Sequence, residues 1–286
     1  MSMTINTNVN SLTAQRNTAL NSASLATTMA RLSSGLRVNS AKDDAAGLAI
    51  ADRMNTQVRG MNVAIRNAGD GISMAQVAEG GLSAINDMLQ RMRELAVQAA
   101  NSTNTTGAGG DIDKLGKEYT ELAGEVARMM EATQFNGEKI LSGVAADYTF
   151  QVGANSAAEN QITISSSVLS MDGTDLSGVL VGGAAEELDI TDHSANLAVL
   201  QGLDDALAAV NDARASLGAV QSRFENTVSF LRTAVENQSA ARGRIMDADF
   251  AAETANLSRT QILQQAGTAM VAQANQLPQG VLSLLR

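Results

Sequence analysis

The sequence predicts a mainly α protein, built as a long antiparallel helical rod with a terminal coiled-coil pair and a small β-hairpin region. Apolar residues make up 44% of the chain but aromatic residues only 2%, so the core must come from aliphatic and methionine side chains that pack helix against helix. The single proline, Pro278, leaves almost nothing to break long helices. Apolar residues also recur at spacings of three and four over stretches longer than a compact domain needs.

A narrow apolar seam near the N-terminus is typical of a coiled coil. It repeats at spacings of four, three and four and consists of Leu25, Met29, Leu32 and Leu36. The stretch from Ser33 to Ser40 then weakens the helix and predicts a joint. Ser40 and Asp43 fit a capping box for the next helix, whose dipole also favours Asp44. Capping explains these carboxylates better than metal or acid–base chemistry, because no histidine or third carboxylate lies nearby in the sequence.

Helical spacing continues from Asp44 to Asn101, which would form a helix roughly 87 Å long at 1.5 Å per residue. Two groups of glycines disagree with this prediction. Asn67 to Gly71 and the pair Gly80 and Gly81 would ordinarily indicate turns, because each glycine inside a helix costs about 0.5 to 1 kcal/mol. The sequence pattern alone does not decide whether this helix is continuous or broken at the glycines.

The middle of the chain predicts a loop, a shorter helix and a hairpin. Ser102 to Gly110 is rich in loop formers, and the apolar repeat from Ile112 to Met129 predicts a helix that folds back on the long one. Gln134 to Gly137 marks the end of that helix. Residues 147–165 then predict the only clear β-hairpin, through the alternating apolar residues Tyr148, Phe150, Val152, Ile162 and Ile164. Residues 165–195 predict no firm element.

The C-terminal part predicts a second long helix and a second seam. Leu200 to Val235 keep helical spacing, and Arg242 to Asp249 resembles another joint. The closing seam alternates at spacings of four and three and consists of Leu263, Gly267, Met270, Ala274, Leu277, Val281 and Leu284. A lone helix of this length is marginal in water, and glycine and alanine bury little apolar area. The seam therefore needs a partner.

The composition argues against catalysis, metal binding and phosphate binding. The chain has no cysteine, and its one histidine, His193, lies in a polar acidic stretch, so neither a catalytic dyad nor a zinc site can be completed. The glycine-rich residues 107–110 lack the lysine of a phosphate-binding loop. A net charge of −10 argues against nucleic acid or an anionic membrane as partner. Neither a cleavable secretory signal nor a run of 18 apolar residues is visible. We therefore expect no enzyme, no metal and no cofactor.

Several blocks of sequence together resemble bacterial flagellin. They occur in the family's order and at both ends of the chain, and they cover about four fifths of it, most weakly between Ala145 and Ser194. The blocks are RLSSGLRVNSAKDDAAGLAIADRM, RNAGDGISMAQ, QRMRELAVQAANSTN, TQFNGEKIL, LGAVQSRF and SRTQILQQAGTAMVAQANQLPQGVLSLLR.

The resemblance implies a subunit with two domains. Residues 1–42 and 247–286 would pair as an inner coiled-coil domain, and residues 43–246 would form an outer helical-rod domain that carries the hairpin near 147–165. The two seams would then meet each other and copies of themselves in neighbouring subunits. The resemblance also favours one continuous helix through the glycines, whose small size could admit close neighbours.

The resemblance further implies a structural protein that polymerises into the bacterial flagellar filament for swimming. Flagellins are exported unfolded by the flagellar type III apparatus, and their terminal segments fold on assembly. The implied partners are other copies of the chain, an export chaperone, and the hook-filament junction and cap proteins, with an extracellular location. A hook-filament junction protein of the same family is the alternative.

One segment resembles a site that host cells recognise. Gln90 to Gln98 match the flagellin site bound by Toll-like receptor 5 of vertebrates, which places Arg91 and Leu95 at its most important positions. Glu118 aligns with the third, and Met92 stands where recognised flagellins commonly have valine. The same stretch could instead serve mainly to pack neighbouring outer domains.

Overall fold

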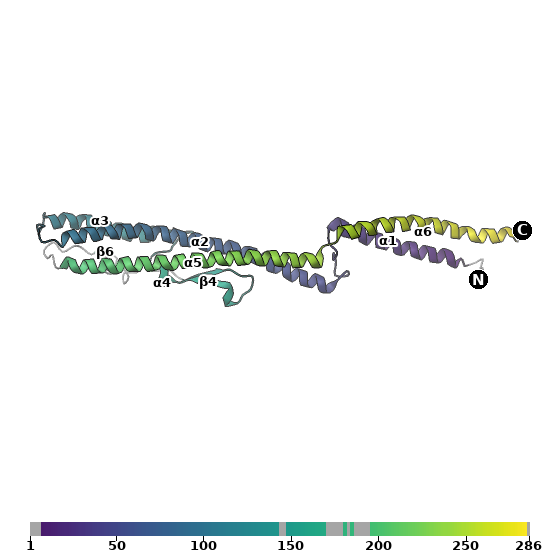
Figure 1. Ribbon diagram of the computed structural model, residues 1–286, viewed down its shortest axis with the longest axis horizontal. Coiled ribbons are helices and arrows are strands. Elements are labelled where there is room, and N and C mark those ends of the chain that lie inside the picture. Colours follow the sequence, from purple (N-terminus) through teal and green to yellow (C-terminus); the bar gives the residue numbers. More distant parts are fainter. Residues whose placement is uncertain (1–6, 143–146, 170–179, 182–183, 186–194, 285–286) are drawn as a thin grey trace. The chain divides into compact units, whose positions relative to one another are not determined.

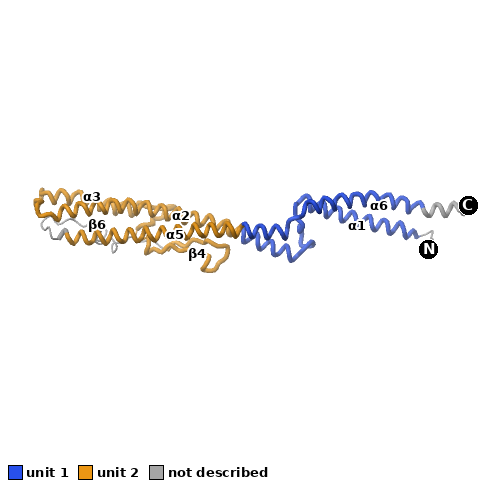
Figure 2. The backbone as a smooth tube through the Cα atoms, in the orientation of Figure 1, with its two compact units in different colours: residues 1–58, 236–286 blue, residues 59–235 orange. Residues whose placement is uncertain are grey.

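The computed structural model describes residues 7–142, 147–169, 180–181, 184–185 and 195–284, of which residues 180–181, 184–185, 195–196 and 277–284 are described by their backbone alone. Long helices dominate, as predicted (Figure 1). Two compact units can be distinguished, residues 1–58 with 236–286 and residues 59–235 (Figure 2).

Two antiparallel terminal helices, α1 (Val9–Ser34) and α6 (Phe250–Leu284), lie side by side in the first unit, which confirms the predicted terminal pair (Figure 1). The side chain of Asn8 caps α1 by accepting a hydrogen bond from the Ser11 backbone N–H at 3.1 Å. Gly35 ends α1 at φ 72°, a left-handed conformation that glycine adopts at little cost. The Asp249 carboxylate caps α6 by accepting from the Ala251 N–H at 2.9 Å.

The joint after α1 pairs with the backbone of residues 246–248, which lead into α6. The Arg37 N–H donates to the Met246 carbonyl at 2.6 Å, and the Ala248 N–H donates to the Gly35 carbonyl at 2.9 Å. Leu36 therefore forms a β-bridge with Asp247. This corrects the predicted N-terminal seam, because Leu36 lies beyond the helix that carries its other members. The second joint is also shorter than expected, since α5 (Ala195–Met246) continues to Met246.

The long helix α2 (Ala45–Ala99) is continuous through Gly69, Gly71, Gly80 and Gly81, as the resemblance favoured. Asp44 caps it, since its carboxylate accepts from the Gly47 N–H at 2.8 Å. Asp43 instead accepts from the Ser40 N–H at 3.0 Å and closes a turn before the helix. The predicted capping box therefore does not start α2. These Ser40 hydrogen bonds lower the pKa of Asp43 below its ordinary value.

The glycines of α2 have different surroundings. A methyl group at Gly71 would lie 2.7 Å from Cζ of the buried Phe224 ring, whereas one at Gly69 would meet no atom within 4 Å. Gly71 thus confirms the expected close neighbour, and Gly69 does not.

We expect these two glycines to respond oppositely to alanine. Gly71→Ala should lower the free energy of unfolding by about 1 to 3 kcal/mol, because the rigid ring must move. Gly69→Ala should raise it by about 0.5 to 1 kcal/mol, because alanine is the better helix former. Urea unfolding of both variants measures the difference, and equal effects would contradict the close packing at Gly71.

The middle segment forms helix α3 (Asp111–Ala132) and three small strand pairs among the described residues. The predicted hairpin is confirmed as antiparallel β3 (Tyr148–Gln151) and β4 (Gln161–Ile164), with Tyr148 opposite Ile164. It is not the only β structure. A tight hairpin joins β1 (Gln134–Phe135) to β2 (Glu138–Lys139), and β5 (Leu180–Val181) pairs with β6 (Ala184–Ala185). Short helical turns η1 (Ala158–Asn160) and α4 (Ser166–Leu169) flank β4.

The second unit contains the hydrophobic core. Helices α2, α3 and α5, the segment after β2 and the β3–β4 hairpin supply its large, fully buried side chains: Tyr119, Phe224, Met74, Leu82, Ile85, Leu89, Met92, Leu95, Ile112, Ile140, Leu141 and Ile164. The Phe224 ring packs edge-on against Phe150, with centroids 5.6 Å apart and planes at 88°. No helix in the described ranges is both long and apolar enough to cross a membrane.

Candidate interaction surfaces

The contact face between α1 and α6 is made of small and polar side chains. Ser11 Oγ donates to Asn275 Oδ1 at 2.7 Å, and Asn8 Nδ2 donates to the Ala274 carbonyl at 2.7 Å. Near the middle of the pair, a methyl group at Gly267 would lie 2.8 Å from Thr18 Oγ1. At these points the two helices therefore approach closely through hydrogen bonds and small residues.

The residues of the predicted C-terminal seam do not all meet α1, and Met29 of the predicted N-terminal seam is exposed. Gly267 and Ala274 belong to the face that meets α1, and Ala274 is buried. Leu263 and Met270 remain 43% and 57% exposed, and Met29 on α1 is 56% exposed.

The remaining seam members are either half-buried or lie where only the backbone is described. Leu25 and Leu32 are half-buried on α1. Leu277, Val281 and Leu284 lie in the part of α6 where only the backbone is described. The expected pairing of large apolar seam residues within one chain is therefore met only in part, because the close approach at Gly267 selects a neighbouring face.

Large apolar side chains are left exposed on both terminal helices. Among the described large apolar side chains, those at least 43% exposed are Val9, Leu12, Leu20 and Met29 on α1, and Phe250, Ile262, Leu263 and Met270 on α6. At 100° per residue, Leu12 and Leu20 lie on one face of α1, opposite the face of Ser11 and Thr18. Fully burying each such side chain would contribute about 1.5 to 3 kcal/mol. Much of the apolar surface of α1 and α6 is thus available to another molecule.

In the second unit, an ion-pair network links α2 to α3. Arg91 donates from Nε and Nη2 to Glu118 Oε1 at 3.0 and 2.8 Å, and from Nη1 to Glu94 Oε2 at 2.9 Å. These bonds raise the pKa of Arg91, and the hydrogen bonds that it donates to Glu118 contribute most. The side chains of Arg91 and Glu118 are 50% and 47% exposed.

Leu95 lies at a different depth. It was expected on the same recognised surface, but it is only 1% exposed and belongs to the hydrophobic core. The structure therefore brings Arg91 and Glu118 together at the surface and places Leu95 beneath them.

A separate ion pair links α2 to α5. Arg93 Nε donates to Asp204 Oδ1 at 2.6 Å, which lowers the pKa of Asp204 and raises that of Arg93. An open hollow of about 450 Å³ next to it is lined by Gln90, Arg93, Glu94 and Val97, and Val97 is 50% exposed. Arg93 and Asp204 were not singled out from the sequence, because residues 111 positions apart give no local pairing signal.

Groups that could hold a metal are not found among the described residues, where no three carboxylate or histidine side chains gather. His193 lies outside the described ranges.

Comparisons with known proteins agree in a single family. Residues 5–146 match the bacterial flagellin N-terminal helical region, and residues 200–285 match the bacterial flagellin C-terminal helical region. A flagellin of Halalkalibacterium halodurans is 45% identical over 99% of this chain and 100% of its own length. The flagellar filament 33 kDa core protein of Treponema phagedenis is 41% identical over 99% of this chain and 100% of its own length.

Among solved structures, a crystal structure of Bacillus cereus flagellin matches 62% of this chain and 94% of its own, with 28% identity and a TM-score of 0.48. The family assignment depends on the sequence matches, which cover both helical ends and the whole length of the relatives. By these matches, the chain belongs to the bacterial flagellin family.

Proposed function

We propose that this flagellin polymerises with copies of itself into the extracellular flagellar filament that drives swimming. The observation that carries the proposal is the exposed apolar surface of α1 and α6, which a single chain leaves in water. A second copy of the chain is the occupant that the family implies. The role is structural, and we infer no catalytic activity and no cofactor.

The proposed subunit has an inner domain of residues 1–42 and 247–286 and an outer domain of residues 43–246. Two observations support these boundaries. The chain leaves helical structure between the end of α1 at Ser34 and the start of α2 at Ala45, and again between Met246 and Phe250. The exposed members of both seams, Met29, Leu263 and Met270, would be buried between neighbouring subunits as the filament forms.

Assembly and folding are coupled in this proposal. The chain would be exported unfolded, bound before export by a chaperone, and added to the filament near its cap, beyond the hook-filament junction. A hook-filament junction protein remains the alternative, but neither relative described above carries that name. The contact between α1 and α6 supports coupling, because the described contacts involve small and polar residues while large apolar side chains of both helices stay exposed in the separate subunit.

Hydrogen exchange on subunits and filaments tests this coupling. In the separate subunit, amides of residues 7–35 and 255–284 should exchange orders of magnitude faster than those of the second unit. In the filament they should become strongly protected. Full protection of both terminal segments in the separate subunit would contradict the proposal, and the core amides of α2 near Leu89 serve as the internal control.

We further propose that Arg91 and Glu118 form the surface that host Toll-like receptor 5 recognises, with Leu95 supporting α2 from the core. The ion pair between the two exposed side chains supports this role, because it fixes their positions across two helices. Arg91→Ala should weaken receptor binding at least tenfold, whereas Arg128→Ala, which removes a similar exposed pair elsewhere on α3, should leave it unchanged. Surface plasmon resonance on the separate subunits measures both, and equal binding by all three proteins would refute the role of Arg91.

A further inference from the structure

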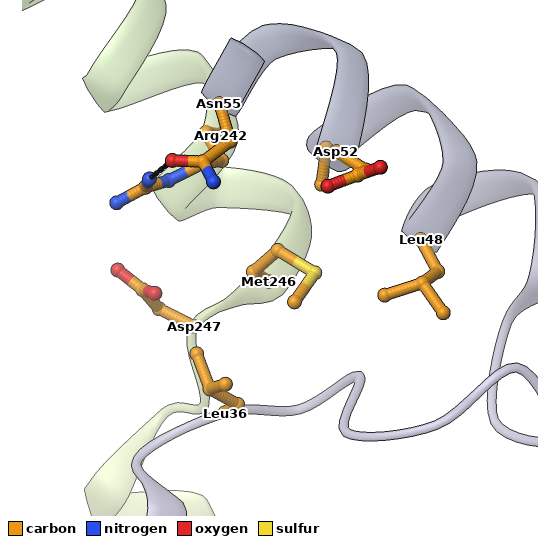
Figure 3. Close-up of a pocket in the computed structure, with 8 residues that line it drawn as sticks. Leu36, Leu48, Asp52, Asn55, Arg242, Met246 and Asp247 are labelled. Atoms are coloured by element: carbon orange, nitrogen blue, oxygen red, sulfur yellow. Dashed lines mark hydrogen bonds between the residues drawn. The ribbon is translucent and has the colours of Figure 1, made fainter. Parts of the chain in front are cut away.

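A cavity of about 300 Å³ lies beside the joint in the first unit (Figure 3). Its lining comes from the joint, the start of α2 and the end of α5, and consists of Leu36, Leu48, Ala51, Asp52, Asn55, Arg242, Met246 and Asp247. Figure 3 shows the Asp52 and Asp247 side chains apart from each other, with Met246 between them. Leu36, Leu48 and Met246 give the cavity apolar walls.

The cavity carries more negative than positive charge. Arg242 is its one cationic lining residue, and Arg242 Nη1 donates to the neutral amide oxygen Oδ1 of Asn55 at 2.7 Å (Figure 3). No ion pair of Asp52 or Asp247 is found among the described residues. A matching occupant would therefore combine a positive charge with apolar groups.

The outward face of α1 has this composition. Arg16 lies one helical turn from Leu12 and one turn from Leu20, which are 56% and 63% exposed. In the described part of the chain, no hydrogen bond or ion pair of the Arg16 side chain is found, and residues 1–40 contain no acidic residue at all. The face therefore presents one unneutralised guanidinium between two leucines.

The two surfaces cannot meet within one chain. Arg16 lies about 27 Å along α1 from Ser34, the last helical residue before the joint, at 1.5 Å per residue. An arginine side chain is far shorter than that distance. Contact between the two surfaces therefore requires two copies of the chain.

We propose that the joint cavity accepts Arg16, with Leu12 and Leu20 around it, from a second copy of this chain. This deepens the proposed polymerisation and rests on it. The contact is heterologous, since each copy offers its α1 face at one place and its cavity at another, and such contacts build open helical polymers when they do not close into rings. The acidic lining, Asp52 and Asp247, attracts the guanidinium, and the leucines pack on the apolar walls.

Charge exchange between the two surfaces tests the contact. Arg16→Glu places an acid against the acidic cavity, and Asp52→Arg places a base against Arg16. Each single variant should raise the critical concentration for polymerisation by about tenfold or more, because close charge pairs across an interface are strongly coupled. Arg16→Glu combined with Asp52→Arg should return it to within about threefold of the unchanged protein.

Mixing the two single variants sharpens the test. In a heterologous contact, Glu introduced at position 16 meets Arg introduced at position 52, and the unchanged Arg16 meets the unchanged Asp52. The equimolar mixture should therefore polymerise at concentrations where neither variant does alone, as sedimentation and electron microscopy would show. Arg16→Lys is the matched control and should polymerise normally.

The outcomes separate this inference from the function on which it rests. Normal polymerisation of Arg16→Glu, or no recovery in either the double variant or the mixture, overturns the contact and leaves the filament proposal intact. Failure of the unchanged protein to polymerise overturns both. Circular dichroism confirms that each variant retains the helix content of the unchanged subunit.

Discussion

Removing residues Leu263 to Arg286 should abolish polymerisation while the second unit stays folded. The deletion takes away most of α6, including the exposed Met270 and the residues that hydrogen-bond to Asn8 and Ser11 of α1. Helix α1 then has no partner, and an isolated helix of its length is marginal in water. The second unit, residues 59–235, keeps its own core.

Two measurements check the deletion. Electron microscopy and sedimentation should find no filaments at concentrations at least a hundredfold above the critical concentration of the intact chain, an order-of-magnitude expectation from the apolar burial lost. Thermal unfolding followed by circular dichroism should still show a cooperative transition for the second unit. The matched control replaces two exposed polar residues of α6, Gln265 and Thr268, by alanine and should leave polymerisation within a few-fold of normal. Filaments formed by the truncated chain would refute the assembly role of α6.

The helices could be predicted from the sequence because their apolar residues repeat over many turns. That repeat held through Gly69 and Gly80 in α2, where local propensity alone indicates turns. Tertiary packing outweighed propensity, since α2 buries apolar residues along most of its length against α3 and α5. The small β1–β2 hairpin was missed, although Asn136 and Gly137 form the dipeptide typical of a two-residue hairpin turn and have φ angles of 53° and 84°.

The interaction surfaces could be predicted less well, because periodicity tells which residues share a helix face but not which face meets a partner. Met270 and Gly267 both fit the C-terminal seam, yet only Gly267 lies against α1. Likewise, Leu95 lies one turn from Arg91 in the sequence, and only the packed structure places one in the core and the other at the surface. Leu36, Asp52 and Arg242 line the same cavity beside the joint, and no local sequence pattern connects residues so far apart.

Replacing Phe224 by alanine should be among the most damaging single substitutions in the second unit. Its ring is fully buried on α5, packs edge-on against Phe150 and occupies the space that Gly71 leaves on α2. Three elements therefore lose a shared contact at once, and the cavity cannot be filled by Gly71, which has no side chain. We expect the free energy of unfolding to fall by about 3 to 5 kcal/mol, the range for a buried phenylalanine.

Phe230 on the same helix is the matched control for Phe224. It has the same side chain six residues further along α5 but is 70% exposed, so Phe230→Ala should change the free energy of unfolding by less than about 0.5 kcal/mol. Urea unfolding of the separate subunits compares the two variants on the same core. Phe230→Ala can still weaken polymerisation, which is measured separately, because an exposed ring on the subunit is available to a neighbouring copy. Similar losses of stability from both substitutions would contradict the packing of α5 against α2 through Phe224, whereas a loss confined to Phe224→Ala assigns the energy to the ring that meets Gly71.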